Sequence, residues 1–336
     1  MKIGPVDLTR EILIVAEIGN NHEGDLGRAE EMIHRAAEAG AQAVKFQTIE
    51  PERLVAADQT ARLEQLRRFA LTADDHGRLA AVAGKAGVLF LSTPFSLDAV
   101  ALLDPLVPAF KIASGDNDFA PLLTRVAATG KPLLISTGMS APNDIALAVS
   151  RIRKAWRDAQ AGDPGLVLLH CVSAYPTPSH AANLRAILSL PAYGAVPGYS
   201  DHTLGIEAAV LSVALGARVI EKHFTLSKTQ SEFRDHQLSA EPRELAELVE
   251  RVRAAEELLG DGVKRILDEE APVAAAARRS ICTARALEPG QIVGPQDLAW
   301  LRPAGGLPPG REAEVLGRRM TRPIPAGTPL TPELVD

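Results

Sequence analysis

Two histidines, His202 and His223, lie just past short apolar runs, and the segment 206–215 between them carries small and apolar residues at helical spacing. This pattern predicts a strand–helix–strand unit whose two strands lie side by side and parallel. Both imidazoles would then emerge at the same end of the sheet, close enough to share one ion. Imidazole is the commonest side-chain ligand of a borderline divalent metal, and Asp201 and Glu221 add charge complementarity. Two histidines alone are a weak signal, and structural or solvent-facing roles stay open.

Two lysines, Lys45 and Lys111, lie inside the apolar runs V-K-F and F-K-I and are expected at adjacent strand ends. Because unpaired lysines are rarely buried, their positions favour a function over an ordinary place on the barrel rim. Lysines with nearby hydroxyls can bind phosphate and carboxylate, and lysines can also form Schiff bases. The hydroxyls expected beside them belong to Ser92, Thr93, Ser114 and Ser136.

Glu17, within V-A-E-I-G-N-N-H-E-G, is a carboxylate at the end of an apolar run. A catalytic role and a salt bridge to a lysine are both open. Asp235 and His236 lie in a polar segment where a substrate lid would be, with a solvated loop as the alternative. Cys171 ends an apolar run and is expected to be a small buried residue rather than a nucleophile.

Short apolar segments alternate with longer helical patterns as far as about residue 260. Eight such units are the size and rhythm of a (β/α)₈ barrel. A doubly wound sheet would need fewer units, and no G-x-G-x-x-G follows the first segment. The strands are expected at 12–18, 43–47, 88–91, 109–113, 133–136, 166–170, 195–199 and 218–222.

Reactive residues recur at the carboxyl ends of these expected strands, which is where a barrel builds its active site. A random scatter of polar residues would not follow the strand ends so regularly. The residues are Glu17, Lys45, Gln47, Ser92, Thr93, Lys111, Ser114, Ser136, Thr137, Ser173, Tyr175, Ser200, His202 and His223.

The composition excludes several classes of protein. With 46% hydrophobic and 23% charged residues, the 336-residue chain is typical of a soluble globular protein. A net charge of −6 without a dense basic block argues against nucleic acid as a partner. Only two cysteines occur, so a disulfide framework is excluded and a reducing cytoplasm is expected. We find neither the apolar core of a signal peptide nor an apolar run near the ~20 residues of a membrane span.

The pattern of the sequence changes after residue 260. We predict a barrel over 1–262, a charged and Ala-rich linker over 263–278, and a small module over 279–336. The module repeats a strand-like pattern around P-G and A-G turns, which predicts a compact β-clip. It is too small to hold much core alone, so we expect it to pack on another surface.

Taken together, these motifs resemble the sialic acid synthase family, which condenses phosphoenolpyruvate with an N-acylated amino sugar. The tail from 278 to 336 looks like the antifreeze-like (SAF) domain that follows the barrel in that family. The matching stretches are A-E-I-G-N-N-H-E-G (16–24), V-K-F-Q-T (44–48), L-S-T-P-F-S (91–96), F-K-I-A-S-G-D (110–116), I-S-T-G-M (135–139), H-C-V-S-A-Y-P-T-P (170–178), G-Y-S-D-H-T-L-G (198–205) and I-E-K-H-F-T (220–225).

The resemblance implies a role for each matching position. His202 and His223 would hold Mn²⁺ or Mg²⁺, and Glu17 would lie beside the reacting carbons. It also implies a homodimer in which the small domain of one subunit caps the partner's barrel, with Arg302 reaching the sugar's N-acyl group. The residues expected to bind phosphoenolpyruvate are Lys45, Thr93, Lys111, Ser114, Ser136, Ser173 and Ser200, and those expected to face the sugar are Gln47, Tyr175 and Asp235.

Three departures from the family pattern all concern the sugar half. Asp116 stands where glutamate is usual, the loop 229–238 differs before its Asp-His, and the stretch 50–67 is short and lacks a sugar-contacting asparagine. The implied reaction therefore gives a nonulosonic acid and phosphate, from N-acetylmannosamine or a 2,4-diacetamido-trideoxyhexose. The alternatives are a Schiff-base aldolase on the same barrel and a sugar- or ice-binding protein without activity.

Overall fold

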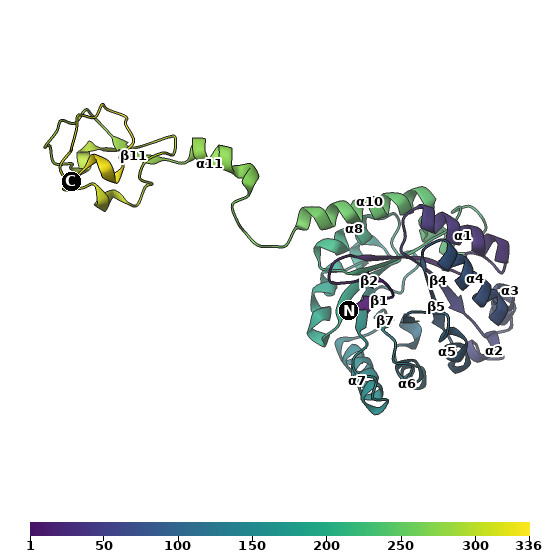
Figure 1. Ribbon diagram of the computed structural model, residues 1–336. Helices are drawn as coiled ribbons and strands as arrows, with labels where there is room; N and C mark the ends of the chain where they lie inside the picture. The colour runs from purple at the N-terminus through teal and green to yellow at the C-terminus, as the bar shows by residue number, and fades with distance from the viewer. The chain divides into compact units, whose positions relative to one another are not determined.

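The computed structural model describes residues 1–336, which form two compact units, Met1–Gly260 and Asp261–Asp336 (Figure 1). Each unit has its own apolar cluster and is described by itself. No helix in either unit combines the length and the apolarity that crossing a membrane requires.

The first unit is a barrel of eight parallel strands. They pair in the order β5-β4-β3-β10-β9-β8-β7-β6, and β5 contacts β6 to complete the ring. Each predicted strand is present, with ends displaced by at most three residues, so the predicted (β/α)₈ fold is confirmed. The strands are β3 (Leu13–Gly19), β4 (Ala43–Thr48), β5 (Leu89–Pro94), β6 (Phe110–Ile112), β7 (Leu133–Ser136), β8 (Leu166–Cys171), β9 (Val196–Asp201) and β10 (Val219–His223).

Helices follow the strands around the outside of the barrel (Figure 1). Their starts carry recognisable signals: Asp25 caps α1, Thr72 and Asp75 form a capping box on α4, and Pro142 opens α7. The helices are α1 (Leu26–Glu38), α2 (Pro51–Leu54), α3 (Thr60–Phe69), α4 (Ala73–Lys85), α5 (Leu97–Leu103), α6 (Ala120–Ala127), α7 (Pro142–Asp158), α8 (Glu207–Ala214), α9 (Asp235–Leu238) and α10 (Pro242–Leu259).

One crossover departs from this rhythm. Between β8 and β9 the chain forms the 3₁₀ helix η3 (Leu184–Tyr193) rather than an α-helix. Asn183 at its start is left-handed with φ 42°, and Pro191 lies inside it. Proline removes a backbone donor and clashes with the preceding turn, which disfavours a regular α-helix here.

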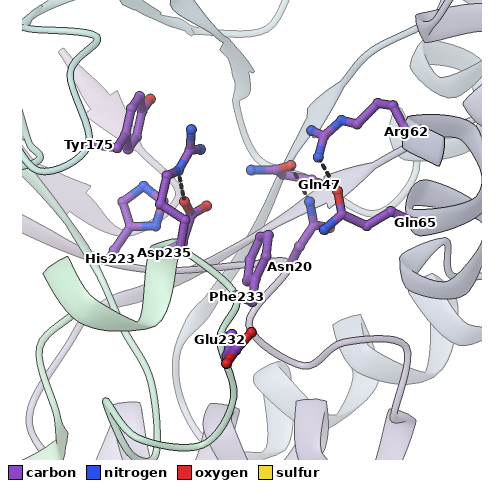
Figure 2. A pocket seen from close by; sticks show the side chains of 10 residues that line it. Asn20, Gln47, Arg62, Gln65, Tyr175, His223, Glu232, Phe233 and Asp235 are labelled. Atoms are coloured by element: carbon purple, nitrogen blue, oxygen red, sulfur yellow. Dashed lines mark hydrogen bonds and ion pairs between the residues drawn. The ribbon is translucent and has the colours of Figure 1, made fainter. Parts of the chain in front are cut away.

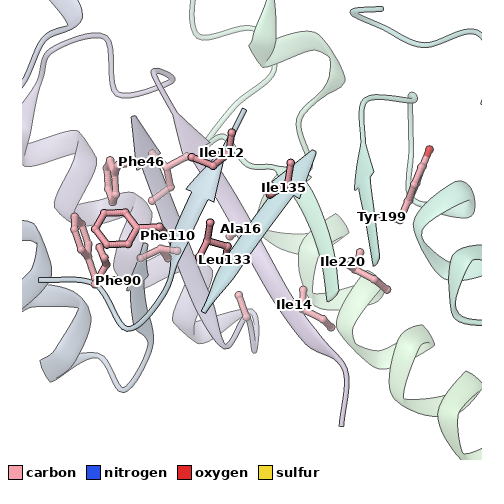
Figure 3. Close-up of a cluster of buried hydrophobic side chains, with 14 of the residues drawn as sticks. Ile14, Ala16, Phe46, Phe90, Phe110, Ile112, Leu133, Ile135, Tyr199 and Ile220 are labelled. Carbon is pink, nitrogen blue, oxygen red and sulfur yellow. The ribbon is translucent and has the colours of Figure 1, made fainter. Parts of the chain in front are cut away.

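Side chains along each barrel strand alternate between the interior and the helix layer, as the two-residue period of a strand requires. The outward residues, among them Phe46, Phe110, Ile135 and Ile220, pack in the large apolar cluster beneath the helices (Figure 3). The inward apolar residues form a second cluster inside the barrel: Leu13, Val15, Ala43, Leu91, Ala109, Leu134, Val167, Leu169 and Val219.

A short hairpin at the start of the chain completes this interior cluster. Strands β1 (Lys2–Ile3) and β2 (Val6–Asp7) pair antiparallel, and the side chains of Ile3, Val6 and Leu8 are buried with the inward apolar residues. The two-residue strands are too short to show a period in the sequence. The hairpin gives the barrel interior a dry floor, opposite the end where the polar residues gather.

The second unit contains helix α11 (Ala271–Ala277) and the antiparallel strands β11 (Ser280–Thr283) and β12 (Leu298–Leu301). The helix falls inside the predicted linker. The expectation that the module holds little core is wrong, because turns and isolated bridges bring eleven apolar residues together. They are Ile281, Leu287, Val293, Leu298, Leu307, Val315, Met320, Ile324, Leu330, Leu334 and Val335.

We expect Ile3→Ala to lower the free energy of unfolding of the barrel by roughly 2–5 kcal/mol, because it opens a cavity in a fully buried cluster. Urea unfolding followed by far-ultraviolet circular dichroism measures this change. Leu147→Ala on α7, where the side chain is half exposed, is the matched control and should change little. Equal stability of Ile3→Ala and the wild type would show that the hairpin is not part of the core.

Candidate active site

Four charged side chains meet inside the barrel, just above its apolar layer. Lys45 Nζ lies 2.7 Å from Glu17 Oε2 and 3.6 Å from Glu221 Oε2, and Lys111 Nζ lies 3.8 Å from Glu221 Oε1. All four are buried. Since a buried charge is costly unless it is paired, the alternating order of acids and bases explains how the strands can carry them.

The surroundings give the carboxyl groups of Glu17 and Glu221 very different pKa values. Burial raises the pKa of Glu17 to about 7, with Lys45 opposing and Glu221 adding to the rise. Burial also acts against ionisation of Glu221, but Lys111, Lys45 and the Ser200 hydroxyl outweigh it and lower its pKa to about 2. Glu221 is therefore the fixed anion, whereas Glu17 can hold or release a proton near neutral pH.

The two lysines do not lie on adjacent strands, contrary to the prediction. Lys45 is on β4 and Lys111 on β6, with β5 between them in the ring. Their ammonium groups approach the same carboxylate because inward side chains converge on the barrel axis. That carboxylate, Glu221, was expected to add charge beside the two histidines, and its pairing with the lysines was not predicted. The available signal was the two-residue period of I-E-K-H, which puts Glu221 and His223 on the same face.

Hydroxyl groups surround the charged cluster. Lys45 Nζ donates to Thr93 Oγ1 at 3.2 Å, Lys111 Nζ donates to Ser136 Oγ at 2.7 Å, and Ser200 Oγ donates to Glu221 Oε1 at 2.9 Å. The expectation for Ser92 is wrong. It precedes the inward-facing Thr93, so it points out of the barrel, and its Oγ lies 2.8 Å from Thr48 Oγ1.

Ser114, Ser173 and Gly138 form a narrow cradle next to Lys111 and Ser136. The Gly138 amide donates to Ser114 Oγ at 3.1 Å, and Ser173 Oγ is buried without a partner. A Cβ at Gly138 would lie 2.4 Å from Ser173 Oγ and 2.7 Å from Ser114 Oγ, so a larger residue would displace these hydroxyls. A buried unpaired hydroxyl among fixed donors is an arrangement suited to an anion.

The two histidines meet as predicted, with ring centroids 5.3 Å apart, on the adjacent strand ends of β9 and β10. His202 Nδ1 lies 2.8 Å from the Val172 carbonyl oxygen, and donation to it leaves Nε2 as a free lone pair. His223 Nδ1 is buried without a partner, and burial, followed by His202, lowers the pKa of His223 well below its usual value. His223 can therefore present the neutral nitrogen that a metal requires. At His202, burial opposes protonation, but contact with Cys171 outweighs burial and raises the pKa, so an ion bound there would displace a proton.

This pair fits a metal that takes only part of its ligands from the protein. No group of three or more histidine, cysteine or acidic side chains could by itself enclose an ion. Mn²⁺ and Mg²⁺ commonly keep water or substrate oxygens as further ligands, unlike a closed structural zinc site. The two imidazoles would supply part of the ligand set and leave room for the oxygen ligands that Mn²⁺ and Mg²⁺ prefer.

A buried ion pair on the outer side of β9 and β10 holds the two histidine-bearing strand ends together. Lys222 Nζ lies 2.9 Å from Asp201 Oδ2 and donates to the Thr203 carbonyl oxygen at 2.6 Å. Asp201 Oδ1 accepts from the Thr203 amide at 2.8 Å and from the Tyr199 hydroxyl at 3.2 Å. With side-chain exposures of 1% and 0%, Lys222 and Asp201 are each other's only charge partners.

A cavity of about 450 Å³ opens beside His223 (Figure 2). The expected sugar-facing residues Gln47, Tyr175 and Asp235 all line it. The Arg234 guanidinium lies 4.4 Å from the centroid of the Tyr175 ring, and its Nε lies 3.0 Å from Asp235 Oδ1. The lining residues that were not predicted are Asn20, Arg62, Gln65, Glu232, Phe233 and Arg234.

Comparison with known proteins decides the family. Residues 32–264 match the NeuB family, and residues 278–336 match the SAF domain. The chain belongs to the NeuB family. The predicted resemblance to sialic acid synthases is thereby confirmed, together with the prediction that the chain is an enzyme.

Three relatives show the range of this family. The chain is 37% identical to an N,N'-diacetyllegionaminic acid synthase of Legionella pneumophila, over 99% of this chain and 97% of that protein. It is 33% identical to the human N-acetylneuraminate-9-phosphate synthase, over 96% and 92% of the two chains. The crystal structure of an N-acetylneuraminic acid synthetase from Leptospira borgpetersenii aligns with a TM-score of 0.76 and 35% identity, covering 81% of this chain and 94% of that one.

Two further residues of this NeuB-family chain were connected with the sugar half of the site from the sequence. Arg302 is exposed in the second unit, so its role stays a prediction. Asp116 is half-buried after β6, and its Oδ2 has no hydrogen-bond partner. Burial, and then the neighbouring Asp118, raise the pKa of Asp116 to about 6.

The solvated-loop alternative does not hold for Asp235 and His236 themselves, although the loop before them has exposed residues such as Glu232 and Arg234. Asp235 and His236 are both buried. His236 Nε2 lies 2.9 Å from Glu23 Oε1, which also accepts from Ser231 Oγ at 2.7 Å. Glu23 thus attaches this loop to the loop that follows β3.

Replacing Lys222 by Met should cost about 3–5 kcal/mol of stability, because Asp201 would stay buried without its cation. The double variant Asp201→Asn/Lys222→Met should recover part of that loss. Urea unfolding of both single variants and the double variant gives the coupling free energy. Strict additivity of the two losses would contradict the pairing.

Asp116→Asn should raise the free energy of unfolding at pH 8 and change it little at pH 4. The pKa of Asp116 is higher in the folded state than in the unfolded chain. The folded protein is therefore most stable while the Asp116 carboxyl is protonated, and this stability is lost as the pH rises from about 4 to about 6. After allowance for its partial exposure, the gain at pH 8 is about 1 kcal/mol. Asp118→Asn should give a smaller gain, since it removes only the neighbouring charge. A stability difference that does not vary with pH would contradict the shift.

Proposed function

We propose that this protein condenses phosphoenolpyruvate, water and an N-acylated amino hexose into a nonulosonic acid and phosphate, with Mn²⁺ or Mg²⁺ held by His202 and His223. The observation that carries the proposal is that an anion cradle and a pair of imidazoles with centroids 5.3 Å apart both lie at the carboxyl end of one barrel. The named relatives make sialic, legionaminic and related acids, which supports the same reaction class here.

Phosphoenolpyruvate would bind in the half of the site formed by strand ends. Lys111 supplies a positive charge, and the hydroxyls of Ser136, Ser114 and Ser173 supply directed donors, with Ser114 Oγ oriented by the Gly138 amide. Lys45, beside Thr93, supplies the second positive charge from the opposite side of Glu221. Because these groups are already ordered by one another, little reorganisation is needed on binding.

The acceptor would lie in the 450 Å³ cavity with its aldehyde toward His223, between Tyr175 and Gln47. When bound, the divalent ion supplies Lewis-acid polarisation of a carbonyl oxygen. Gln47 Nε2 donates to Glu17 Oε1 at 3.3 Å, so the acceptor side is linked directly to the carboxyl group beside the reacting carbons.

The reaction then balances without a covalent enzyme intermediate. C3 of phosphoenolpyruvate forms a bond to the aldehyde carbon, whose oxygen gains a proton to become a hydroxyl. C2 acquires cationic character that the Glu17 carboxylate stabilises, and water adds to C2. Breaking the bond between C2 and the bridging oxygen releases phosphate, and loss of the hydroxyl proton at C2 leaves the 2-keto acid. Of the two protons of the added water, one balances the proton gained by the aldehyde oxygen and the other leaves with the phosphate. A pKa near 7 lets Glu17 accept the proton that the water loses.

We also propose that the protein acts as a homodimer in which the SAF domain of one subunit covers the partner's cavity and Arg302 contacts the N-acyl group. Arg302 is exposed and carries a permanent charge, so it can serve as a donor to a carbonyl oxygen.

Phosphate release from phosphoenolpyruvate tests the proposal, with N-acetylmannosamine and a 2,4-diacetamido-trideoxymannose as acceptors. Release should require both an acceptor and Mn²⁺ or Mg²⁺, and EDTA should abolish it. Lys111→Met should lower kcat/KM for phosphoenolpyruvate by about 10²-fold or more, because a charge-assisted contact to the anion is lost.

Borohydride treatment in the presence of a keto acid separates this reaction from the Schiff-base alternative. We expect no trapped lysine, since Lys45 and Lys111 each lie within ion-pair distance of a carboxylate. Trapping at either lysine, or full activity in EDTA, would overturn the proposed mechanism.

A further inference from the structure

The cavity beside His223 has a second wall that the proposed reaction does not explain. Figure 2 shows Tyr175 and His223 on one side and Asn20, Gln47, Arg62 and Gln65 on the other. If the aldehyde lies at His223, the far wall faces the part of the acceptor that is remote from the reacting carbon. Groups on that wall can therefore distinguish acceptors without taking part in the chemistry.

Helix α3 presents two of these residues from one helical turn. Arg62 Nη1 donates to Gln65 Oε1 at 2.6 Å, so the partner of this guanidinium is a neutral amide rather than a carboxylate. One lone pair of the Gln65 oxygen is used by Arg62, and the remaining N–H groups of Arg62 and Gln65 can be offered to a ligand. Arg62 and Gln65 together form a surface of donors.

Asn20 adds an acceptor to the same wall. Its Nδ2 donates to Gln47 Oε1 at 2.8 Å, while its Oδ1 is buried and has no partner. The residue is only 6% exposed, so water meets little of this amide. An unpaired buried oxygen is costly, and a ligand N–H or O–H would satisfy it.

The wall is held in place by packing rather than by the ligand. Leu63, Leu66 and Phe69 are the buried face of α3. Phe69 contacts Phe233 edge-on at 5.1 Å, and a Cβ at Gly24 would lie 1.9 Å from the Arg68 carbonyl oxygen. The helix, the loop after β3 and the loop before α9 thus support one another, which favours selective binding by a preformed site.

We propose that Arg62, Gln65 and Asn20 form a subsite for a second acylamino group at the far end of the acceptor, so that the substrate is a hexose with two such groups. An acylamino group has a carbonyl oxygen for Arg62 or Gln65 and an N–H for Asn20 Oδ1. A phosphate group could accept from Arg62 and Gln65 but would leave Asn20 Oδ1 facing anionic oxygens, near Glu232 and Asp235. A single hydroxyl group has only one oxygen to bind both the donors of Arg62 and Gln65 and the Asn20 Oδ1 acceptor, so it fits the subsite less well.

This inference rests on the proposed reaction and is tested with three acceptors: a 2,4-diacetamido-trideoxymannose, N-acetylmannosamine and N-acetylmannosamine 6-phosphate. The full-length protein should prefer the diacetamido sugar in kcat/KM. Arg62→Ala and Gln65→Ala should each reduce the ratio of kcat/KM for the diacetamido sugar over N-acetylmannosamine by up to about tenfold, as expected for the loss of one hydrogen bond to the ligand. The KM for phosphoenolpyruvate should stay within about twofold, because these residues lie away from the anion cradle.

Arg67→Ala is the matched control, because Arg67 lies on the same helix but pairs with the exposed Glu52 at 2.7 Å. It should leave the acceptor ratio unchanged. A wild-type preference for the 6-phosphate or for N-acetylmannosamine would overturn the inference, as would an unchanged ratio in Arg62→Ala and Gln65→Ala.

Calorimetry with the diacetamido sugar alone separates failure of this inference from failure of the proposed reaction. Binding that Arg62→Ala weakens, without phosphate release from any acceptor, would support the subsite and reject the reaction. Phosphate release with binding that neither variant alters would support the reaction and reject the subsite.

Discussion

Charged side chains can lie inside this barrel only because each one lies against an opposite charge. Lys45 lies between Glu17 and Glu221, and Lys111 lies beside Glu221. These ion pairs take the place of the water that would surround four exposed ions. The arrangement needs a dry floor, which the inward apolar residues and the first hairpin provide. The low dielectric of the interior strengthens the ion pairs and raises the pKa of Glu17. The packing below the site therefore determines the chemistry above it.

The last strand of the barrel serves stability and function through its two faces. Inward, Glu221 joins the two lysines and His223 faces the cavity. Outward, Lys222 pairs with Asp201 of the neighbouring strand in complete burial. Because successive strand residues point in opposite directions, the same five-residue strand can fix its register on one side while it supplies reactive groups on the other.

The two halves of the site are formed by different kinds of structural element. The anion half consists of strand ends and the tight turn at Gly138, where little can change without a clash. The proposed acceptor half consists of α3 and the loop before α9, which meet through Phe69 and Phe233, and Glu23 of the loop after β3 binds His236 beside them. Loops and surface helices accept substitutions that strand ends do not, which explains how one reaction class in this family serves several acceptors.

The sequence by itself determined the eight strands, the polar residues at their ends and the neighbouring positions of His202 and His223. These features follow from local periodicity and from the handedness of parallel crossovers. Only the tertiary structure decided that Glu221 lies between the two lysines and that Arg62 of α3 faces the cavity. Such contacts depend on closure of the ring and on the rotation of a helix against it, and hence on residues distant in sequence, which no local pattern records.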